Sequence, residues 1–164
     1  MEKYKVLDDF LPQDMFNEMA KFITSPGSFP LYYHDCIVSD SNRYKEFYFV
    51  HHLYYDSLPR SECYTPIVEP FIERLAIHSV IRAKVNAVLR TETIVEHDQH
   101  CDFDIPHNTV IFYLNSNDGF TRLEDGTKIN SVANRILLLD GSVKHNSTSC
   151  TDQDLRFVLN LNFI

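Results

Sequence analysis

The segment at residues 155–163, LRFVLNLNF, alternates in polarity more clearly than any other part of the chain. The side chains that fall on one face are apolar: Phe157, Leu159, Leu161 and Phe163. Those on the other face are mostly polar: Arg156, Val158, Asn160 and Asn162. Successive side chains of a strand point to opposite faces, so one face should border a core and the other water or a cavity. This pattern predicts a β-rich fold in which the last strand forms part of a polar wall.

Turn signals divide the C-terminal half into short strands. Three of the four glycines lie after residue 115, and each of these three follows an aspartate. Asp-Gly pairs between alternating apolar segments are strong hairpin signals. We therefore expect strands near residues 80–90, 108–115, 119–124, 132–139, 142–147 and 155–163.

The N-terminal half mixes helix and strand signals. A helix is expected to open near Pro12, with apolar residues at helical spacing, and to end at the Ser-Pro-Gly sequence of residues 25–27. Thr65 and Pro66 indicate the start of a second helix, and Pro70 inside it is an alternative start. Strands are expected at residues 4–7 and 44–55.

Length, charge and cysteine content limit the class of protein. The chain has 164 residues, and we expect one domain over 1–164, with a helix-containing part at 1–79 and a β core at 80–164. The formal net charge of -8 argues against a protein that holds nucleic acid mainly through phosphate contacts. No apolar segment approaches the ~20 residues of a membrane span. The four cysteines form no C-x-x-C pair, so we expect free thiols and a cytoplasmic protein.

The densest set of potential metal ligands lies at residues 96–107, EHDQHCDFDIPH. His100 and Asp102 are two residues apart, and on extended backbone such residues share a face. A lone H-x-D triplet is weak evidence, but His145 follows downstream and Arg156 stands eleven residues after it. Two histidines and a carboxylate form the site of non-haem iron(II) oxygenases. An arginine fork suits the far carboxylate of a 2-oxo acid.

These residues resemble the motif of the iron(II)- and 2-oxoglutarate-dependent dioxygenases, specifically the small prolyl-4-hydroxylase-like branch. The resemblance covers residues 80–164 in most detail and extends weakly to VLDDFL near the N-terminus. It implies a double-stranded β-helix, a jelly-roll barrel with N-terminal helices packed on one sheet. The iron ligands that it implies are His100, Asp102 and His145. The residues that it implies for 2-oxoglutarate are Arg156 and Tyr113 of the segment IFYLN.

The implied activity is hydroxylation of a C–H bond, with release of succinate and carbon dioxide and with ascorbate as a candidate reductant. The family branch favours a peptidyl, prolyl-like substrate, and a free amino acid or small metabolite is nearly as well supported. Stretches similar to NDGFTRLEDG also occur in phage members of the family, which hints at a phage origin and then at the host cytoplasm. One departure is the strand KVNAVLR before H-x-D. Some prolyl hydroxylases have a tyrosine there, and here Asn86, Arg90 or no residue takes its place.

The remaining candidates are weaker. Asp104 is the main alternative to Asp102, but it is four residues from His100. The other histidines are expected to have lesser roles: His97 in solvent, His107 as a capping or supporting residue, and at most one of His51 and His52 facing the cavity.

The alternative function is a non-catalytic jelly-roll module, binding or structural, with a structural metal or none. Arg156 discriminates between the two functions, because a structural metal site needs no buried cation beside it. A nucleic-acid demethylase of the same superfamily is disfavoured by the negative charge and by the lack of a basic stripe.

Overall fold

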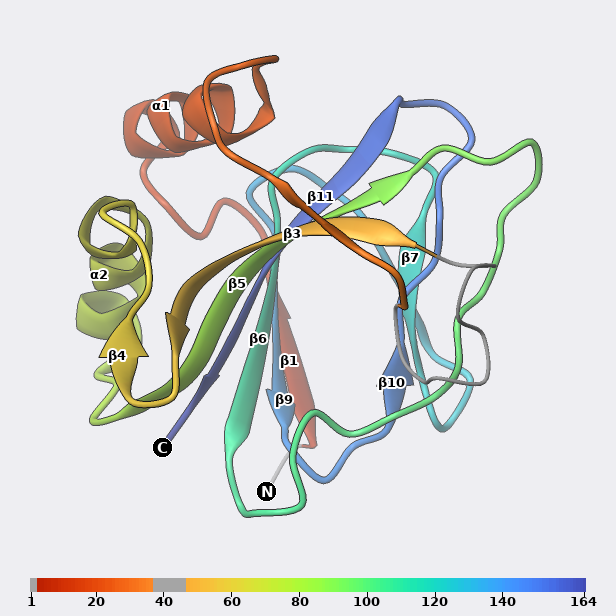
Figure 1. The fold of residues 1–164 in the computed structure, drawn as a ribbon. Helices are drawn as coiled ribbons and strands as arrows, with labels where there is room; N and C mark the ends of the chain where they lie inside the picture. The colour runs from red at the N-terminus through yellow and green to blue at the C-terminus, as the bar shows by residue number, and fades with distance from the viewer. Residues whose placement is uncertain (1–2, 37–46) are drawn as a thin grey trace.

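Residues 3–36 and 47–164 are described by the structure, a computed structural model (Figure 1). The helices are α1 (Gln13–Thr24) and α2 (Tyr64–Leu75). The strands are β1 (Tyr4–Leu7), β2 (Tyr32–His34), β3 (Tyr48–Tyr55), β4 (Leu58–Pro59), β5 (Val80–Leu89), β6 (Asn108–Tyr113), β7 (Phe120–Leu123), β8 (Lys128–Asn130), β9 (Ile136–Asp140), β10 (His145–Asn146) and β11 (Leu155–Phe163). Neither described helix is long and apolar enough to cross a membrane.

The strands form two antiparallel sheets. The larger has the order β1-β9-β6-β11-β5-β3-β2, with β4 paired to β3, and the smaller has the order β10-β7-β8. Both helices lie on one side of the large sheet, and β7 and β10 lie on its other side (Figure 1). The result is a two-sheet sandwich with a helical layer on one outer face.

Strands β5 and β11 form the centre of the large sheet, and their two faces differ in chemistry. The predicted apolar face of β11 is confirmed, because Phe157, Leu159 and Leu161 lie in the main hydrophobic core. On this face the two helices contribute buried apolar side chains, among them Phe16 and Phe71. The opposite face of both strands carries polar side chains toward the small sheet. Because the helices pack only on the apolar face, this polar face is available for a site.

Most predicted elements are found, with shifted ends. The second helix begins at Tyr64 and continues through Pro70, so the alternative start at Pro70 is wrong. Burial of Ile67, Val68 and Phe71 offsets the backbone hydrogen bond that Pro70 cannot make. The strand predicted at 44–55 is β3, and residues 44–46 lie outside the described residues.

The strand predicted at 132–139 is β9, which begins only at Ile136, and β8 (Lys128–Asn130), which precedes it, was not predicted. The connection turns at Asn134, whose φ of 63° lies in the left-handed region that asparagine tolerates better than most residues. Its side chain binds the backbone of Leu11, in the segment between β1 and α1. The amide oxygen accepts from the Leu11 N–H at 2.9 Å, and the amide nitrogen donates to the Leu11 carbonyl at 2.8 Å.

We expect Asn134→Ala to lower the free energy of unfolding by about 2–4 kcal/mol, because the buried Leu11 backbone groups would lose both partners. Urea denaturation would measure the change. The matched control is Asn130→Ala, since Asn130 is exposed and a surface substitution of this kind should change stability by less than about 0.5 kcal/mol. Equal free energies of unfolding for the two variants would show that the hydrogen bonds between Asn134 and Leu11 do not stabilise the fold.

Candidate metal centre

Backbone pairing brings His100 and His145 together. The two residues form an isolated antiparallel bridge, in which each backbone N–H donates to the other's carbonyl at 3.0 Å. Residues paired in this way project to the same face, and the two imidazole centroids lie 4.9 Å apart. His145 also pairs with Leu123 of β7, so the small sheet fixes the position of both rings.

The histidine rings are oriented by main-chain carbonyls. Nδ1 of His100 lies 3.2 Å from the Asp98 carbonyl, and Nδ1 of His145 lies 3.2 Å from the Val143 carbonyl. A carbonyl only accepts, so each Nδ1 carries the proton and each Nε2 presents its lone pair. Ligating histidines are commonly oriented by such a bond from the other ring nitrogen.

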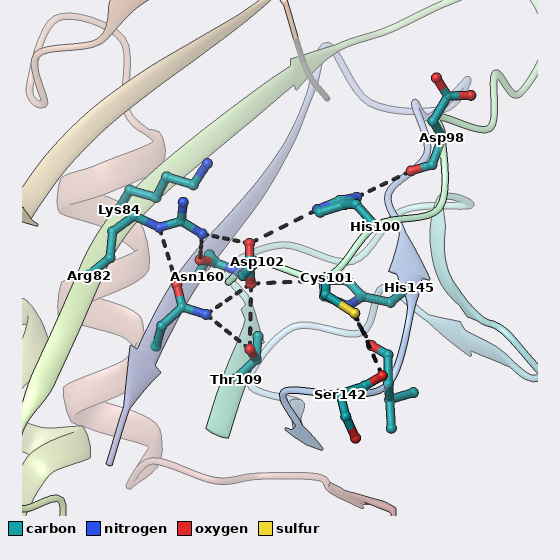
Figure 2. A network of polar contacts seen from close by, with 12 residues as sticks. Arg82, Lys84, Asp98, His100, Cys101, Asp102, Thr109, Ser142, His145 and Asn160 are labelled. Atoms are coloured by element: carbon teal, nitrogen blue, oxygen red, sulfur yellow. Dashed lines mark hydrogen bonds and ion pairs between the residues drawn. The ribbon is translucent and has the colours of Figure 1, made fainter. Parts of the chain in front are cut away.

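Asp102 lies opposite these lone pairs and is held by a network from three strands (Figure 2). Arg82 of β5 donates to Oδ1 at 2.5 Å, and the side-chain amide of Asn162 on β11 donates to Oδ2 at 2.9 Å. Asn160 on β11 and Thr109 on β6 add longer bonds to Oδ2, at 3.2 and 3.5 Å. The polar positions of the last strand therefore serve to position this carboxylate.

Burial alone would raise the pKa of Asp102, but the positive charge of Arg82, the His145 ring and the Asn162 amide outweigh burial and lower the pKa. The carboxylate is therefore ionised at any physiological pH. Burial also lowers the pKa of His145, which favours the neutral ring that a metal ion requires.

The three side chains fit a divalent metal. Their ligand atoms all lie within 4.8 Å of one another. Nε2 of His100 and Nε2 of His145 are each 4.0 Å from an oxygen of Asp102. Two imidazole nitrogens and one carboxylate oxygen are the donor set of the facial-triad iron sites. The three ligands predicted from the sequence are brought together, while Asp104 is exposed and lies outside the cluster.

Arg156 lies in the same cavity as the three ligands and is only 1% exposed. Its guanidinium donates to three hydroxyls: Ser131 at 2.8 Å, Ser147 at 2.9 Å and Thr121 at 3.3 Å. Among the described residues, no carboxylate forms an ion pair with it. A guanidinium has five N–H donors, so two remain for a ligand. Burial lowers its pKa, but an arginine stays charged, and the site is therefore built around an unpaired buried cation.

Tyr113 contacts Arg156 through its ring and binds a hydroxyl that Arg156 also binds. The guanidinium lies 5.6 Å from the centroid of its ring, and its hydroxyl donates to the Thr121 hydroxyl at 2.9 Å. Thr121 accepts from both residues and lines the cavity, whereas Tyr113 is fully buried. The contact of Tyr113 with 2-oxoglutarate stays a prediction.

Some sequence expectations need correction. His97 does not face solvent: it is 5% exposed, because its N–H donates to the Ser147 carbonyl and its own carbonyl accepts from the Asn146 amide. Burial, followed by the charge of Arg156, lowers its pKa to about 4. Arg90 pairs with Asp154 at the surface and does not line the cavity, whereas Asn86 does.

The other histidines lie outside the ligand cluster. His51 and His52 face opposite sides of β3, and only His52 shares the face of Lys84. His107 is buried, its Nδ1 donates to the Ile105 carbonyl at 2.7 Å, and its ring fills the space where a side chain at Gly141 would lie.

Sequence reasoning missed two cations of β5, Arg82 and Lys84. Arg82 binds Asp102, and Lys84 lines the cavity. Both occupy the same face of the strand as Asn86 and lie opposite the asparagines of β11, with Arg82 paired to Asn162 and Lys84 to Asn160. The spacing of Arg82 and Lys84 indicates that they share one face of the strand. Only the register with β11 shows that this face borders the cavity.

No profile of a known protein family matches the chain, and no curated protein sequence is similar to it. Solved structures do match. A prolyl hydroxylase from Trichoplax adhaerens, in complex with a peptide fragment of the oxygen degradation domain of hypoxia inducible factor, has a TM-score of 0.75 and 15% identity, over 100% of this chain and 84% of that one. A prolyl-4-hydroxylase from Pseudomonas putida has a TM-score of 0.65 and 15% identity, over 98% and 92%.

The α-ketoglutarate-dependent epimerase SnoN from nogalamycin biosynthesis has a TM-score of 0.63 and 10% identity, over 99% of this chain and 76% of that one. At such identities the likeness establishes the fold, and it confirms the mainly antiparallel, jelly-roll part of the architecture that the sequence resemblance implied. The chain has the jelly-roll fold shared by prolyl hydroxylases and other 2-oxoglutarate–iron(II) oxygenases.

Proposed function

We propose that the protein is an iron(II)- and 2-oxoglutarate-dependent oxygenase that hydroxylates a C–H bond. The observation that carries the proposal is the buried Arg156, which has free N–H donors and no carboxylate partner among the described residues, in the cavity of a two-histidine, one-carboxylate cluster. A structural metal site would give no reason to bury such a cation. A dicarboxylate that bridges the metal and the arginine does.

When bound, iron(II) and 2-oxoglutarate supply dioxygen activation, with succinate and carbon dioxide as products of the co-substrate. The protein's own part is positioning and exclusion of water. His100, Asp102 and His145 would hold the metal, and Arg156 the distal carboxylate. The side chain of His100 is 29% exposed and that of His145 only 6%, so the cavity opens on the side of His100. A primary substrate would approach from there.

A peptidyl, prolyl-like residue is the substrate class that we favour. Support comes from the Trichoplax and Pseudomonas structures, which are prolyl hydroxylases, the former with a peptide bound. SnoN and the carbocyclase SnoK share the fold and belong to nogalamycin biosynthesis, so a small molecule is the alternative substrate.

The direct test is succinate release from 2-oxoglutarate by the protein with iron(II) and ascorbate, followed by a mass-spectrometric screen of peptides and amino acids for a gain of one oxygen. Turnover above that of the Asp102→Ala protein supports the oxygenase. Its absence with every substrate, together with undiminished folding, would favour the non-catalytic module.

We expect Asp102→Ala to reduce iron(II) affinity at least about 100-fold, because the only anionic ligand of the cluster is lost. Asp104→Ala is the matched control, since Asp104 is an exposed carboxylate two residues away. Anaerobic iron(II) titration with a competing chelator measures both. Retained affinity in Asp102→Ala with loss in Asp104→Ala would show that the ligand assignment is wrong.

Arg156→Ala should weaken 2-oxoglutarate binding by about 100- to 1,000-fold, because a bidentate, charge-assisted pair in a buried site is removed. Tyr113→Phe should act in the same direction by less, since it deletes one hydrogen bond to Thr121. Iron affinity should change little in either variant. Anaerobic titration of the iron-loaded protein, followed by the metal-to-ligand charge-transfer band, measures the effect, with Arg90→Ala as the control. Wild-type affinity in Arg156→Ala would exclude the arginine as the anchor.

A further inference from the structure

Lys84 is a second cation in the cavity wall, partly buried, and nothing described so far uses it. It lies on β5, paired with Asn160 of β11 on one side and with His52 of β3 on the other. This register places its side chain on the face that carries Arg82 and the asparagines around Asp102. In Figure 2 the ammonium extends past Arg82, and no contact is drawn to it from the residues of the network.

The ammonium of Lys84 has no anionic partner among the described residues. Within the described part of the chain it has one hydrogen bond, a long one of 3.5 Å to the Tyr48 hydroxyl, and the ammonium also lies 5.7 Å from the centroid of the Tyr48 ring. Asp102 interacts with Lys84 electrostatically, but its oxygens already accept hydrogen bonds from Arg82, Asn160, Asn162 and Thr109. A buried ammonium is costly unless it is paired, so the position is explained best by a ligand that brings the anion.

The charge of the cavity also favours the binding of anions. Three cations lie in or directly beside it, Arg82, Lys84 and Arg156, against the one carboxylate of Asp102. Iron(II) would add two positive charges and 2-oxoglutarate two negative ones, so the excess of positive charge persists in the loaded site. A low-dielectric pocket with such an excess attracts anions strongly.

We propose that Lys84 is a second carboxylate-binding residue of the cavity, separate from Arg156. Resting on the proposed function, the inference adds to it a carboxylate near the metal: either the metal-proximal carboxylate of 2-oxoglutarate or a carboxylate of the primary substrate. The two sources share one chemistry and are separated by experiment.

The neighbours of Lys84 suit this role. Tyr48 accepts from the ammonium through its hydroxyl and keeps its own O–H to donate to a ligand. Asn86, one step along the same face of β5, has a buried side-chain oxygen with no hydrogen-bond partner, and its amide can turn its nitrogen toward a carboxylate. Burial, followed by repulsion from Arg82, lowers the pKa of Lys84 to about 8, and the opposing effect of Asp102 is smaller.

The first arm of the test uses 2-oxoglutarate on the iron-loaded protein without oxygen. Lys84→Met should reduce its affinity at least about tenfold if Lys84 holds the metal-proximal carboxylate, because a charge-assisted bond is lost. Lys5→Met is the matched control, since Lys5 is an exposed lysine of β1. Thermal unfolding of Lys84→Met checks the fold, and Lys84→Gln serves as a second variant if the methionine protein is unstable.

The second arm uses two probes that differ only in a carboxylate, N-acetylglycine and N-acetylglycinamide, and follows binding by protein NMR. If the primary substrate supplies the carboxylate, Lys84→Met retains 2-oxoglutarate affinity. The wild type then prefers the acid to the amide, and Lys84→Met loses this preference while Lys5→Met keeps it.

The inference would be overturned by unchanged 2-oxoglutarate affinity in Lys84→Met, together with either no acid preference in the wild type or the same preference in both proteins. Failure of the proposed function is a separate outcome. It would appear as a wild-type protein that binds iron(II) but no 2-oxoglutarate, and the acid–amide comparison would then still decide the role of Lys84.

Discussion

The geometry of the site depends on one buried carboxylate. Asp102 connects the irregular segment between β5 and β6 to the two central strands of the large sheet, through Arg82 on one and the asparagines on the other. Loss of that carboxylate would leave Arg82 buried without its partner and the segment without its anchor. His100 lies two residues from Asp102, and its backbone pairing with His145 joins this segment to β7 of the small sheet.

In strands β5 and β11, one face packs in the hydrophobic core and the other carries the polar residues of the candidate site. On the helix side, Ala83, Val85 and Leu159 are fully buried in the main core, and this apolar contact holds the strands in register. On the other side, the same register aligns cations of β5 with amides of β11. A register slip of one residue would exchange the faces, so the hydrophobic core is also what specifies the polar site.

Much of this arrangement is visible in the sequence, where the alternation of residues 155–163 and the order H-x-D, His, Arg lead to the sheet and to the ligand cluster. What sequence reasoning could not supply is the pairing across strands. Arg82 and Lys84 look like surface charges of an ordinary strand until β11 is placed beside them. The hydroxyls around Arg156 come from Thr121, Ser131 and Ser147, which no local pattern connects. His97 was misjudged because its burial comes from long-range backbone contacts.

The pairing of Arg82 with Asp102 has a consequence for the metal selectivity of the proposed site. Arg82 neutralises the Asp102 carboxylate, so contacts within the protein hold this member of the proposed ligand set in place. A preformed site of nitrogen and oxygen ligands binds cobalt, nickel or copper more tightly than iron(II), following the general order of divalent affinities. Under the proposed function, the ligand set alone would therefore give little preference for iron(II), and the metals available in the cell would decide which ion the site holds.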